Sequence, residues 1–439
     1  MEKHPEQISL PKAVKTFLAT SRDIGKRQLS PEEIENIASS DARIVKAVSR
    51  RLVNFVANGV VLFEKIRSFG KEKPRIISPE SQTLLLAAYT QIHNLETPIL
   101  TNLIRNRLMM ENSRDPSAAR KDRRQQKEKE LVIKLPWSLV IDVTSSCNIN
   151  PPCKGCYAAE YPHAKPTLEQ LNGLAGEAEQ LGINYLIFSG GEPLTRETEL
   201  QQIMKDHPFV NYAIFTNGTL IGEHTPDRFL ATGAVSSMFI HIEGDQEATD
   251  GYMGKGAYDR ITSGMRILKD KGFPFGFAIT VNQENFDKVT SDEFISDLRN
   301  KGCWGGIFFP YVPIGRSPRP DLMLTSEQRQ KLADISTKAQ KEGLLAVSPE
   351  ELYRRRGGCM AGLYASVTVE GKVQPCVFIH ASDSASVYEQ SLETALKGSQ
   401  LLRATQAETK NSSGSCLIRD RNGKLAELVG ETSSASTEK

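Results

Sequence analysis

Three cysteines in the segment SSCNINPPCKGCY are the residues of this sequence best suited to chemistry. Cys147, Cys153 and Cys156 lie within ten residues of one another. Thiolate sulfur is the soft ligand of iron–sulfur clusters, and three thiolates on a four-iron cluster leave one iron open to another ligand. Zinc is the alternative, because Cys-x-x-Cys is also a common half of a zinc site. A structural zinc site usually takes a second cysteine pair at similar spacing, and none follows.

The cysteine segment follows the first of several short apolar runs that alternate with helical stretches. These runs are SLVIDVTSS, NYLIFSGGEP, NYAIFTNG, SMFIHIEG, FGFAITVN and GIFFPYVP. Helices are predicted between them, for instance one that starts at Thr167 with Gln170 completing a capping box, and one through DRITSGMRILKDKG. Strands that are apolar on both faces and separated by helices indicate parallel βα units. We therefore predict an α/β fold with a partial (β/α)6 barrel of the TIM type.

Changes in composition divide the chain further. The helix-like N-terminal region predicts a helical domain at residues 1–112, and the charged, apolar-poor stretch after it predicts a linker at 113–134. The barrel is expected at 135–345. A helix opened by Thr325 and Gln328 precedes a small cysteine-bearing α+β domain at 346–429, where YASVTVEGKVQPCVF predicts a β-hairpin turning at Glu370 and Gly371. The small, polar ending at 430–439 is expected to be disordered.

The overall composition limits the class of protein. The 439 residues carry a net charge of +2, and 39% are hydrophobic, so no polyanionic partner is required. No stretch approaches the roughly 18 apolar residues of a membrane span, and seven cysteines are an odd number that argues against a disulfide scaffold. We expect a cytoplasmic protein. Acidic residues interleave with the basic ones at 113–130, which argues against nucleic-acid binding.

The order of motifs after the strands resembles the radical S-adenosylmethionine (radical SAM) superfamily. SGGEP follows the second run, TNG the third and IEG the fourth. The resemblance implies a 4Fe-4S cluster on the three cysteines, whose open iron binds S-adenosylmethionine. An electron then cleaves the cofactor to a 5′-deoxyadenosyl radical, which abstracts hydrogen from a substrate that the sequence does not identify: a peptide, a lipid or a small metabolite. This chain has Cys-x5-Cys-x2-Cys where most members have Cys-x3-Cys-x2-Cys.

The resemblance also implies a set of cofactor-binding residues. Glycines allow the close backbone approach that the GGE element needs, and its carboxyl group is expected to receive the cofactor's amino group. The strand-end loops of a parallel barrel build the site, which is where these motifs lie. The candidates are Tyr157, Gly190, Gly191, Glu192, Asn217, Glu243, Thr280, Asn282, Val312 and Arg316.

A second cysteine group lies near the C-terminus. Cys359 is followed by eleven residues, Gly371, four residues and Cys376, with Cys416 beyond. This pattern resembles the twitch or SPASM region of the same superfamily and implies one auxiliary 4Fe-4S cluster. Its fourth ligand is open; His380 is the nearest candidate, although a structural histidine is the better interpretation. Cys303 is interpreted as a buried apolar residue.

Two other classes of protein remain as alternatives. A non-enzymatic iron–sulfur electron carrier would explain the cysteines but would give no role to the GGE element. A zinc-stabilised nucleic-acid-binding protein would be expected to interleave basic and aromatic residues. For the radical SAM enzyme, the expected partners are S-adenosylmethionine, the substrate and a reductant of the flavodoxin or ferredoxin type.

Overall fold

A computed structural model describes residues 117–158, 162–183, 185–208, 210–234, 236–356, 359–410, 416–420, 422–432 and 434–436. The helical domain expected at 1–112 and the first residues of the linker lie outside these ranges. The chain divides into two units, and the second, Ala119–Lys439, contains nearly all of the described residues. None of the described helices combines the length and the apolarity needed to cross a bilayer.

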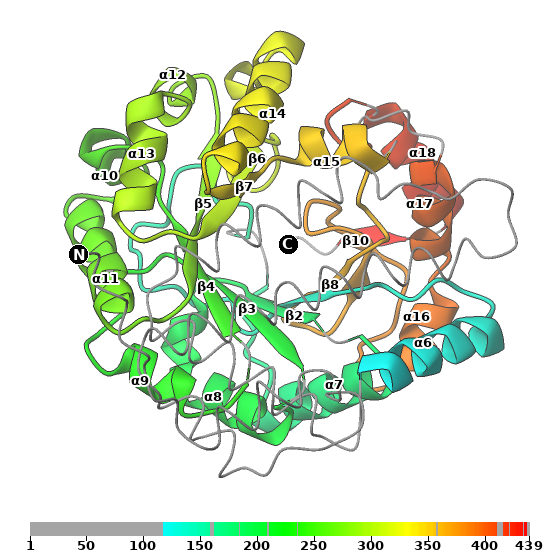
Figure 1. The fold of residues 1–439 in the computed structure, drawn as a ribbon. Helices are drawn as coiled ribbons and strands as arrows, with labels where there is room; N and C mark the ends of the chain where they lie inside the picture. Colours follow the sequence, from blue (N-terminus) through cyan, green and yellow to red (C-terminus); the bar gives the residue numbers. More distant parts are fainter. Residues whose placement is uncertain are drawn as a thin grey trace, which may run out of the picture. The chain divides into compact units, whose positions relative to one another are not determined.

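Six parallel strands form the predicted βα units, and further strands extend the same sheet (Figure 1). The strands are β1 (Leu139–Asp142), β2 (Tyr185–Ser189), β3 (Asn211–Thr216), β4 (Ser236–His241), β5 (Phe275–Val281), β6 (Gly305–Pro310), β7 (Leu345–Val347), β8 (Ala365–Val367) and β9 (Val373–Gln374). Their order is β7-β6-β5-β4-β3-β2-β1-β8-β9. All neighbours are parallel except β8 and β9, and the sheet does not close. The predicted α/β class and open barrel are confirmed.

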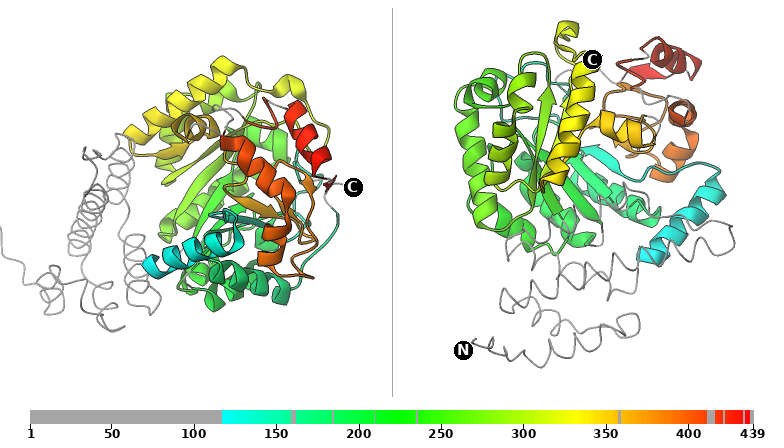
Figure 2. Two further views of the ribbon diagram at one scale, coloured as in Figure 1. Left: turned by 90° about the vertical axis from the view of Figure 1, so that its right-hand side faces the viewer. Right: turned by 45° about the horizontal axis from the view of Figure 1, so that its top comes forward.

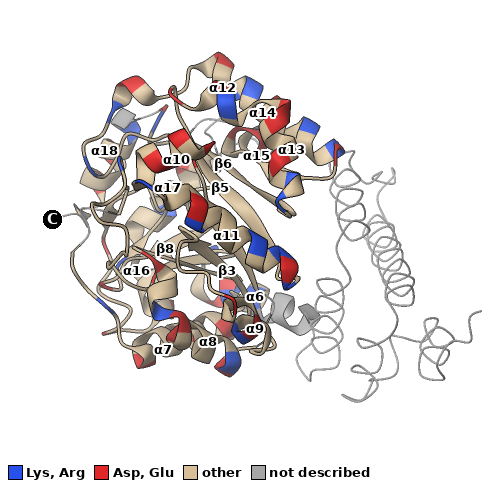
Figure 3. Cartoon of the chain, turned by 90° about the vertical axis from the view of Figure 1, so that its left-hand side faces the viewer, with Lys and Arg blue, Asp and Glu red and all other residues tan. Residues whose placement is uncertain are grey.

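The helices surround the outside of this curved sheet (Figure 2). They are α7 (Leu168–Gln180), α8 (Glu197–Asp206), α9 (Thr225–Leu230), α10 (Gln246–Met253), α11 (Ala257–Asp270), α12 (Phe286–Val289), α13 (Asp292–Asn300) and α14 (Ser326–Lys341), with short 3-10 helices η1 (Pro193–Arg196) and η2 (Pro320–Leu322). Thr167 and Thr325 each complete the predicted capping box, with Gln170 and Gln328. Charged side chains lie mainly on these helices, whereas the strands carry few (Figure 3).

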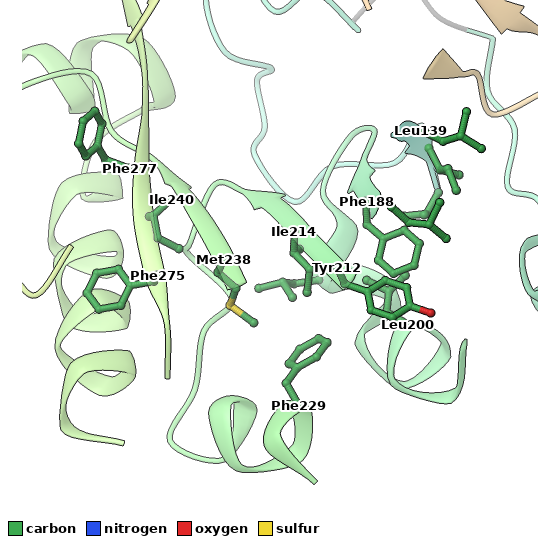
Figure 4. Close-up of a cluster of buried hydrophobic side chains, with 14 of the residues drawn as sticks. Leu139, Phe188, Leu200, Tyr212, Ile214, Phe229, Met238, Ile240, Phe275 and Phe277 are labelled. Carbon is green, nitrogen blue, oxygen red and sulfur yellow. The ribbon is translucent and has the colours of Figure 1, made fainter. Parts of the chain in front are cut away.

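The main core lies between the sheet and the helices. Figure 4 shows Phe188, Tyr212 and Leu200 gathered there, and the rings of Phe188 and Tyr212 stack with centroids 5.4 Å apart. Ile141, Phe188, Ile214, Ile240 and Phe308, on β1, β2, β3, β4 and β6, all belong to this core. Because side chains alternate across a strand, the residues next to them face the inside of the barrel.

The C-terminal region extends the sheet through β8 and β9 and contains further helices. The remaining elements are α6 (Ser117–Leu131), α15 (Pro349–Arg356), α16 (Leu392–Gly398), α17 (Gln400–Lys410), α18 (Asn422–Glu431), β10 (Ala381–Ser382) and β11 (Ala435–Ser436). The predicted hairpin is present as β8 and β9, and β8 pairs directly with β1 of the barrel.

Part of the polar ending at 430–439 forms a short strand in the structure. β11 pairs antiparallel with β10, with Ser436 opposite Ala381. This pairing depends on backbone hydrogen bonds to a distant strand, which the polar composition alone does not predict.

The close contact between β5 and β6 gives a test of the fold. A methyl group on Gly306 would lie 2.3 Å from the carbonyl oxygen of Phe277 and 2.4 Å from its ring. We expect Gly306→Ala to lower the free energy of unfolding by about 1–3 kcal/mol through overpacking, measured by urea denaturation. Gly173→Ala is the control, because Gly173 lies in α7 with no atom within 4 Å of the added methyl group, and alanine favours a helix by about 1 kcal/mol. Equal effects of the two substitutions would contradict the packing.

Candidate active site

The cysteine loop leaves the carboxyl end of β1. Cys147 is exposed, whereas Cys153 and Cys156 are half-buried. Burial raises the pKa of the Cys153 thiol to about 12 and also raises that of Cys147. These thiols therefore stay protonated at neutral pH unless a cation stabilises the thiolates, and cluster iron is such a cation. The donor set fits a three-thiolate cluster.

The GGE turn after β2 is bound to this loop through backbone hydrogen bonds. Gly191 N–H donates to Thr144 O at 2.7 Å, and Glu192 N–H donates to Ser146 O at 2.9 Å. Gly190 has a φ of +124°, and a Cβ added to it would lie 2.3 Å from Thr144 O. A Cβ on Gly191 would lie 2.2 Å from Ser146 O. Both glycines are therefore needed for the close approach that fixes the cysteine loop.

The carboxylate of Glu192 is fully buried and joins β2 to the loop after β3. It accepts hydrogen bonds from Leu194 N–H at 2.9 Å, from the Thr216 hydroxyl at 2.6 Å and from Asn217 N–H at 2.8 Å. Burial raises its pKa to about 7, against the effect of these donors. Both oxygens accept hydrogen bonds from the protein, and these bonds position the TNG loop.

Asn217 extends this network to the first cysteine. Its side-chain nitrogen donates to Asn148 Oδ1 at 2.9 Å and lies 3.9 Å from Cys147 Sγ. Its Oδ1 accepts from the N–H and the hydroxyl of Thr219, at 3.0 and 2.6 Å. The TNG loop thus holds the side of the cysteine loop that carries Cys147.

Glu243 follows β4, Thr280 lies near the end of β5, and Asn282 follows β5. Glu243 is buried, its pKa is raised to about 8 by burial, and its Oε2 accepts from Thr280 N–H at 3.1 Å. A negative charge on Glu243 contributes to the raised pKa of Cys153, after burial and the two neighbouring cysteines. Asn282 Oδ1 instead accepts from Glu284 N–H and Asn285 N–H, so it caps a turn within its own loop.

The segment after β6 connects the cysteine loop to the second cysteine group. Arg316 N–H donates to Cys156 O at 3.3 Å, and a Cβ on Gly315 would lie 2.6 Å from that oxygen. Val312 is buried in an apolar cluster with Cys359 and Cys376. Val312 thus packs against the second group. Tyr157, next to Cys156, contacts the same region through the ring of Phe378, with centroids 6.2 Å apart.

Cys359, Cys376 and Cys416 are all buried and lie in one cluster. A hydrogen bond from Cys416 lowers the pKa of the Cys359 thiol to about 7. Ala361 N–H donates to Cys359 Sγ at 3.5 Å, and the Tyr364 hydroxyl lies 2.9 Å from Cys376 Sγ. Donors aimed at sulfur stabilise thiolates and tune iron–sulfur clusters, so this group also fits a cluster.

His380 and Cys303 are the other two side chains that the sequence analysis considered. His380 Nε2 lies 3.1 Å from Val377 O, and its ring centroid is 6.5 Å from that of Tyr157. Cys303 is buried in the main core, as the sequence predicts, and burial raises its pKa to about 12.

The inward face of the barrel has polar residues that the sequence analysis missed. The last inward-facing residues of β1 to β6 are Asp142, Ser189, Phe215, His241, Thr280 and Phe309. We call them the inner ring. Asp142 is buried and lies beside Ser189 in the strand register. The Tyr157 hydroxyl shares a hydrogen bond of 3.0 Å with the Ser189 hydroxyl. In the sequence, Asp142 stands out as the one acidic residue of the apolar run SLVIDVTSS, and this could have marked it as a site residue.

Asp142 and His241 have unusual titration behaviour for their residue types. Burial raises the pKa of Asp142 to about 7 and lowers that of His241 to about 4. Asp142 Oδ1 has no hydrogen-bond partner among the described residues. Buried polar atoms are nearly always paired, so this oxygen is available to a bound molecule.

Among the described ranges, no three His, Cys, Asp or Glu side chains converge closely enough to hold a single metal ion.

Comparisons with known proteins bear on the domain and the fold. Residues 141–295 match the family model described as the Radical SAM superfamily. An AdoMet-dependent heme synthase of Methanosarcina barkeri is 26% identical over 64% of this chain and 88% of its own length. A PqqA peptide cyclase of Granulibacter bethesdensis is 23% identical over 58% of this chain and 71% of its own. Among solved structures, Streptococcus suis SuiB bound to S-adenosylmethionine aligns with a TM-score of 0.51 at 15% identity, covering 72% of this chain and 83% of SuiB.

The chain therefore carries a radical SAM domain. Its relatives are radical SAM family members named as synthases, cyclases and maturases, and this chain is an enzyme that contains the same domain. The family binds S-adenosylmethionine and an iron–sulfur cluster. The alternatives of a non-enzymatic electron carrier and of a zinc-stabilised nucleic-acid-binding protein are rejected.

The buried acid of the inner ring predicts a pH dependence. The folded-state pKa of Asp142 lies above its unfolded value, so the folded state holds the extra proton and the free energy of unfolding falls as pH rises from about 4 to about 7. Glu192 and Glu243 act in the same direction. We expect the loss of stability between about pH 5 and about pH 7 to be about 2 kcal/mol smaller in Asp142→Asn than in the unsubstituted protein. Urea denaturation of both cluster-free proteins at each pH measures this difference. The same pH dependence in Asp142→Asn and the unsubstituted protein would refute the raised pKa of Asp142.

Proposed function

We propose that Cys147, Cys153 and Cys156 hold a 4Fe-4S cluster at which this enzyme reductively cleaves S-adenosylmethionine. The observation that supports it most is the backbone connection between the cysteine loop and the GGE turn, which requires glycine at both positions. When bound, the cluster supplies the electron for cleavage, and the cofactor supplies the radical that abstracts hydrogen from the substrate. The protein's part is to position these groups and exclude water.

We assign the other candidates to that task by their contacts. Glu192 and Asn217 hold the cysteine loop in place, and Gly190 and Gly191 present backbone to the cofactor. Glu243 accepts a hydrogen bond from Thr280 N–H through Oε2, and its charge contributes to the raised pKa of Cys153. Arg316 and Tyr157 lie on the side of the loop that faces the second cysteine group.

Cys359, Cys376 and Cys416 form the proposed site of one auxiliary 4Fe-4S cluster. Their burial, their common cluster and the donors at their sulfurs support it. Three thiolates leave one iron without a cysteine. The residue boundaries given above for the domains remain our proposal, with β8 joining the auxiliary region to the barrel.

The proposed substrate site is the inner ring. It combines the rings of Phe215 and Phe309 with Asp142 and His241, and the carboxyl ends of barrel strands are where such sites form. Relatives are named for heme synthesis and for a peptide, so an organic substrate with a flat or apolar group and a hydrogen-bonding atom is favoured. We further propose a cytoplasmic enzyme reduced by a flavodoxin- or ferredoxin-type protein.

Cysteine substitutions test the assignment of the first site. We expect reconstituted protein to bind about eight irons per chain, as two 4Fe-4S clusters require, and to form 5′-deoxyadenosine after dithionite reduction. Cys153→Ala should lose about half of the iron and all 5′-deoxyadenosine. Cys303→Ala, which changes a core cysteine, should retain both and serves as the control. The assignment would be contradicted if Cys153→Ala formed 5′-deoxyadenosine. It would also be contradicted if folded Cys303→Ala protein failed to form it.

A further inference from the structure

A surface groove lies where α6 and the residues after it meet α17. Its volume is about 550 Å³, and both helices are drawn in Figure 1. The lining residues are Gln125, Glu128, Lys129, Val132, Ile133, Lys134, Arg403, Gln406 and Ala407. None of them belongs to the radical site or to the inner ring, so the proposed reaction gives the groove no role.

The rim of the groove is positively charged. Lys129, Lys134 and Arg403 are exposed, and none forms an ion pair with a carboxylate within the described part of the chain. The single acidic residue of the lining, Glu128, is already bound by Arg124 and by the N–H of Leu135. The rim therefore presents cations that are available to an acidic partner.

The centre of the groove is apolar. Val132 is 86% exposed and has a φ of +55°, which is costly for a β-branched residue. Ile133 and Ala407 lie beside it in the lining. A small apolar centre surrounded by charged residues is the composition of a transient protein interface, and electron-transfer encounters use the smallest interfaces of this kind.

Hydrogen bonds link the wall of the groove to the segment that carries Cys359. Gln406 Nε2 donates to Lys134 O at 2.9 Å and to Gly362 O at 2.8 Å. Gly362 follows Ala361, whose N–H donates to Cys359 Sγ. An electron arriving at the groove is therefore close to the proposed auxiliary cluster.

The groove also lies away from the substrate entrance. Residues 125–134 precede the amino end of β1, whereas the radical cysteines follow its carboxyl end. A substrate must reach the inner ring at the carboxyl ends of the strands. A peptide bound in this groove would not be positioned for reaction at the inner ring. An electron donor bound there would be positioned to reduce the auxiliary cluster.

We propose that this groove is the docking surface for an acidic one-electron donor protein of the flavodoxin type, which reduces the auxiliary cluster. The inference rests on the proposed function of Cys359, Cys376 and Cys416. In the transfer, the donor's reduced flavin loses one electron and the cluster gains it; no bond to this chain forms or breaks. Charge complementarity steers such an encounter and is weakened by salt.

The test compares two reductants on the same reconstituted full-length protein. The rate of cluster bleaching is measured with flavodoxin kept reduced by its NADPH-dependent reductase, and separately with dithionite. We expect Lys129→Glu, Lys134→Glu and Arg403→Glu, combined, to slow reduction by flavodoxin about tenfold or more, with the dithionite rate unchanged. The salt dependence of the flavodoxin rate should also be lost in this variant.

The control variant makes the same charge change elsewhere. Lys205, Lys331 and Lys341 are exposed and lie on α8 and α14; their combined change to Glu should leave both rates as they were. Arg403→Glu alone serves as the second groove variant if the triple variant does not fold. Equal flavodoxin rates in groove and control variants would overturn the docking surface. Absence of an iron–sulfur cluster that dithionite can reduce would instead show that the proposed function itself is wrong.

Discussion

The buried Glu192 carboxylate is the interaction on which the geometry of the site depends. The backbone N–H of Glu192 donates to Ser146 O in the cysteine loop, and its carboxylate accepts from the Thr216 hydroxyl and from Asn217 N–H. One residue thus joins the carboxyl ends of three strands. Removing a buried acceptor leaves its donors unpaired, at a cost of about 1–3 kcal/mol each. The loops therefore keep one arrangement relative to one another, as a site for a reactive radical requires.

This arrangement continues from the radical site to the second cysteine group. The segment after β6 binds Cys156 through Arg316 N–H and places Val312 among the C-terminal cysteines, while Tyr157 contacts Phe378. Gln406, which lines the cationic groove, donates a hydrogen bond to Gly362 O. The two proposed cluster sites and the groove thus form one continuous series of contacts across the barrel and the C-terminal region.

Local signals in the sequence predicted the six βα strands, the capping boxes at Thr167 and Thr325 and the hairpin of β8 and β9. Each of these follows from residues close together in the chain. The partners of Glu192 and the inward position of Asp142 depend on strand register between distant segments, which hydrophobic periodicity does not encode. For the same reason the pairing of β8 with β1 and of β11 with β10 was not anticipated.

The most direct test of the central claim is electron paramagnetic resonance of the reduced Cys376→Ala variant, in which the auxiliary site is disabled and the first site is intact. The account predicts one 4Fe-4S signal whose g values shift when S-adenosylmethionine is added, because the iron without a cysteine ligand binds the cofactor. A signal that S-adenosylmethionine leaves unchanged, in protein that binds about four irons per chain, would contradict the assignment of Cys147, Cys153 and Cys156 as a radical SAM site.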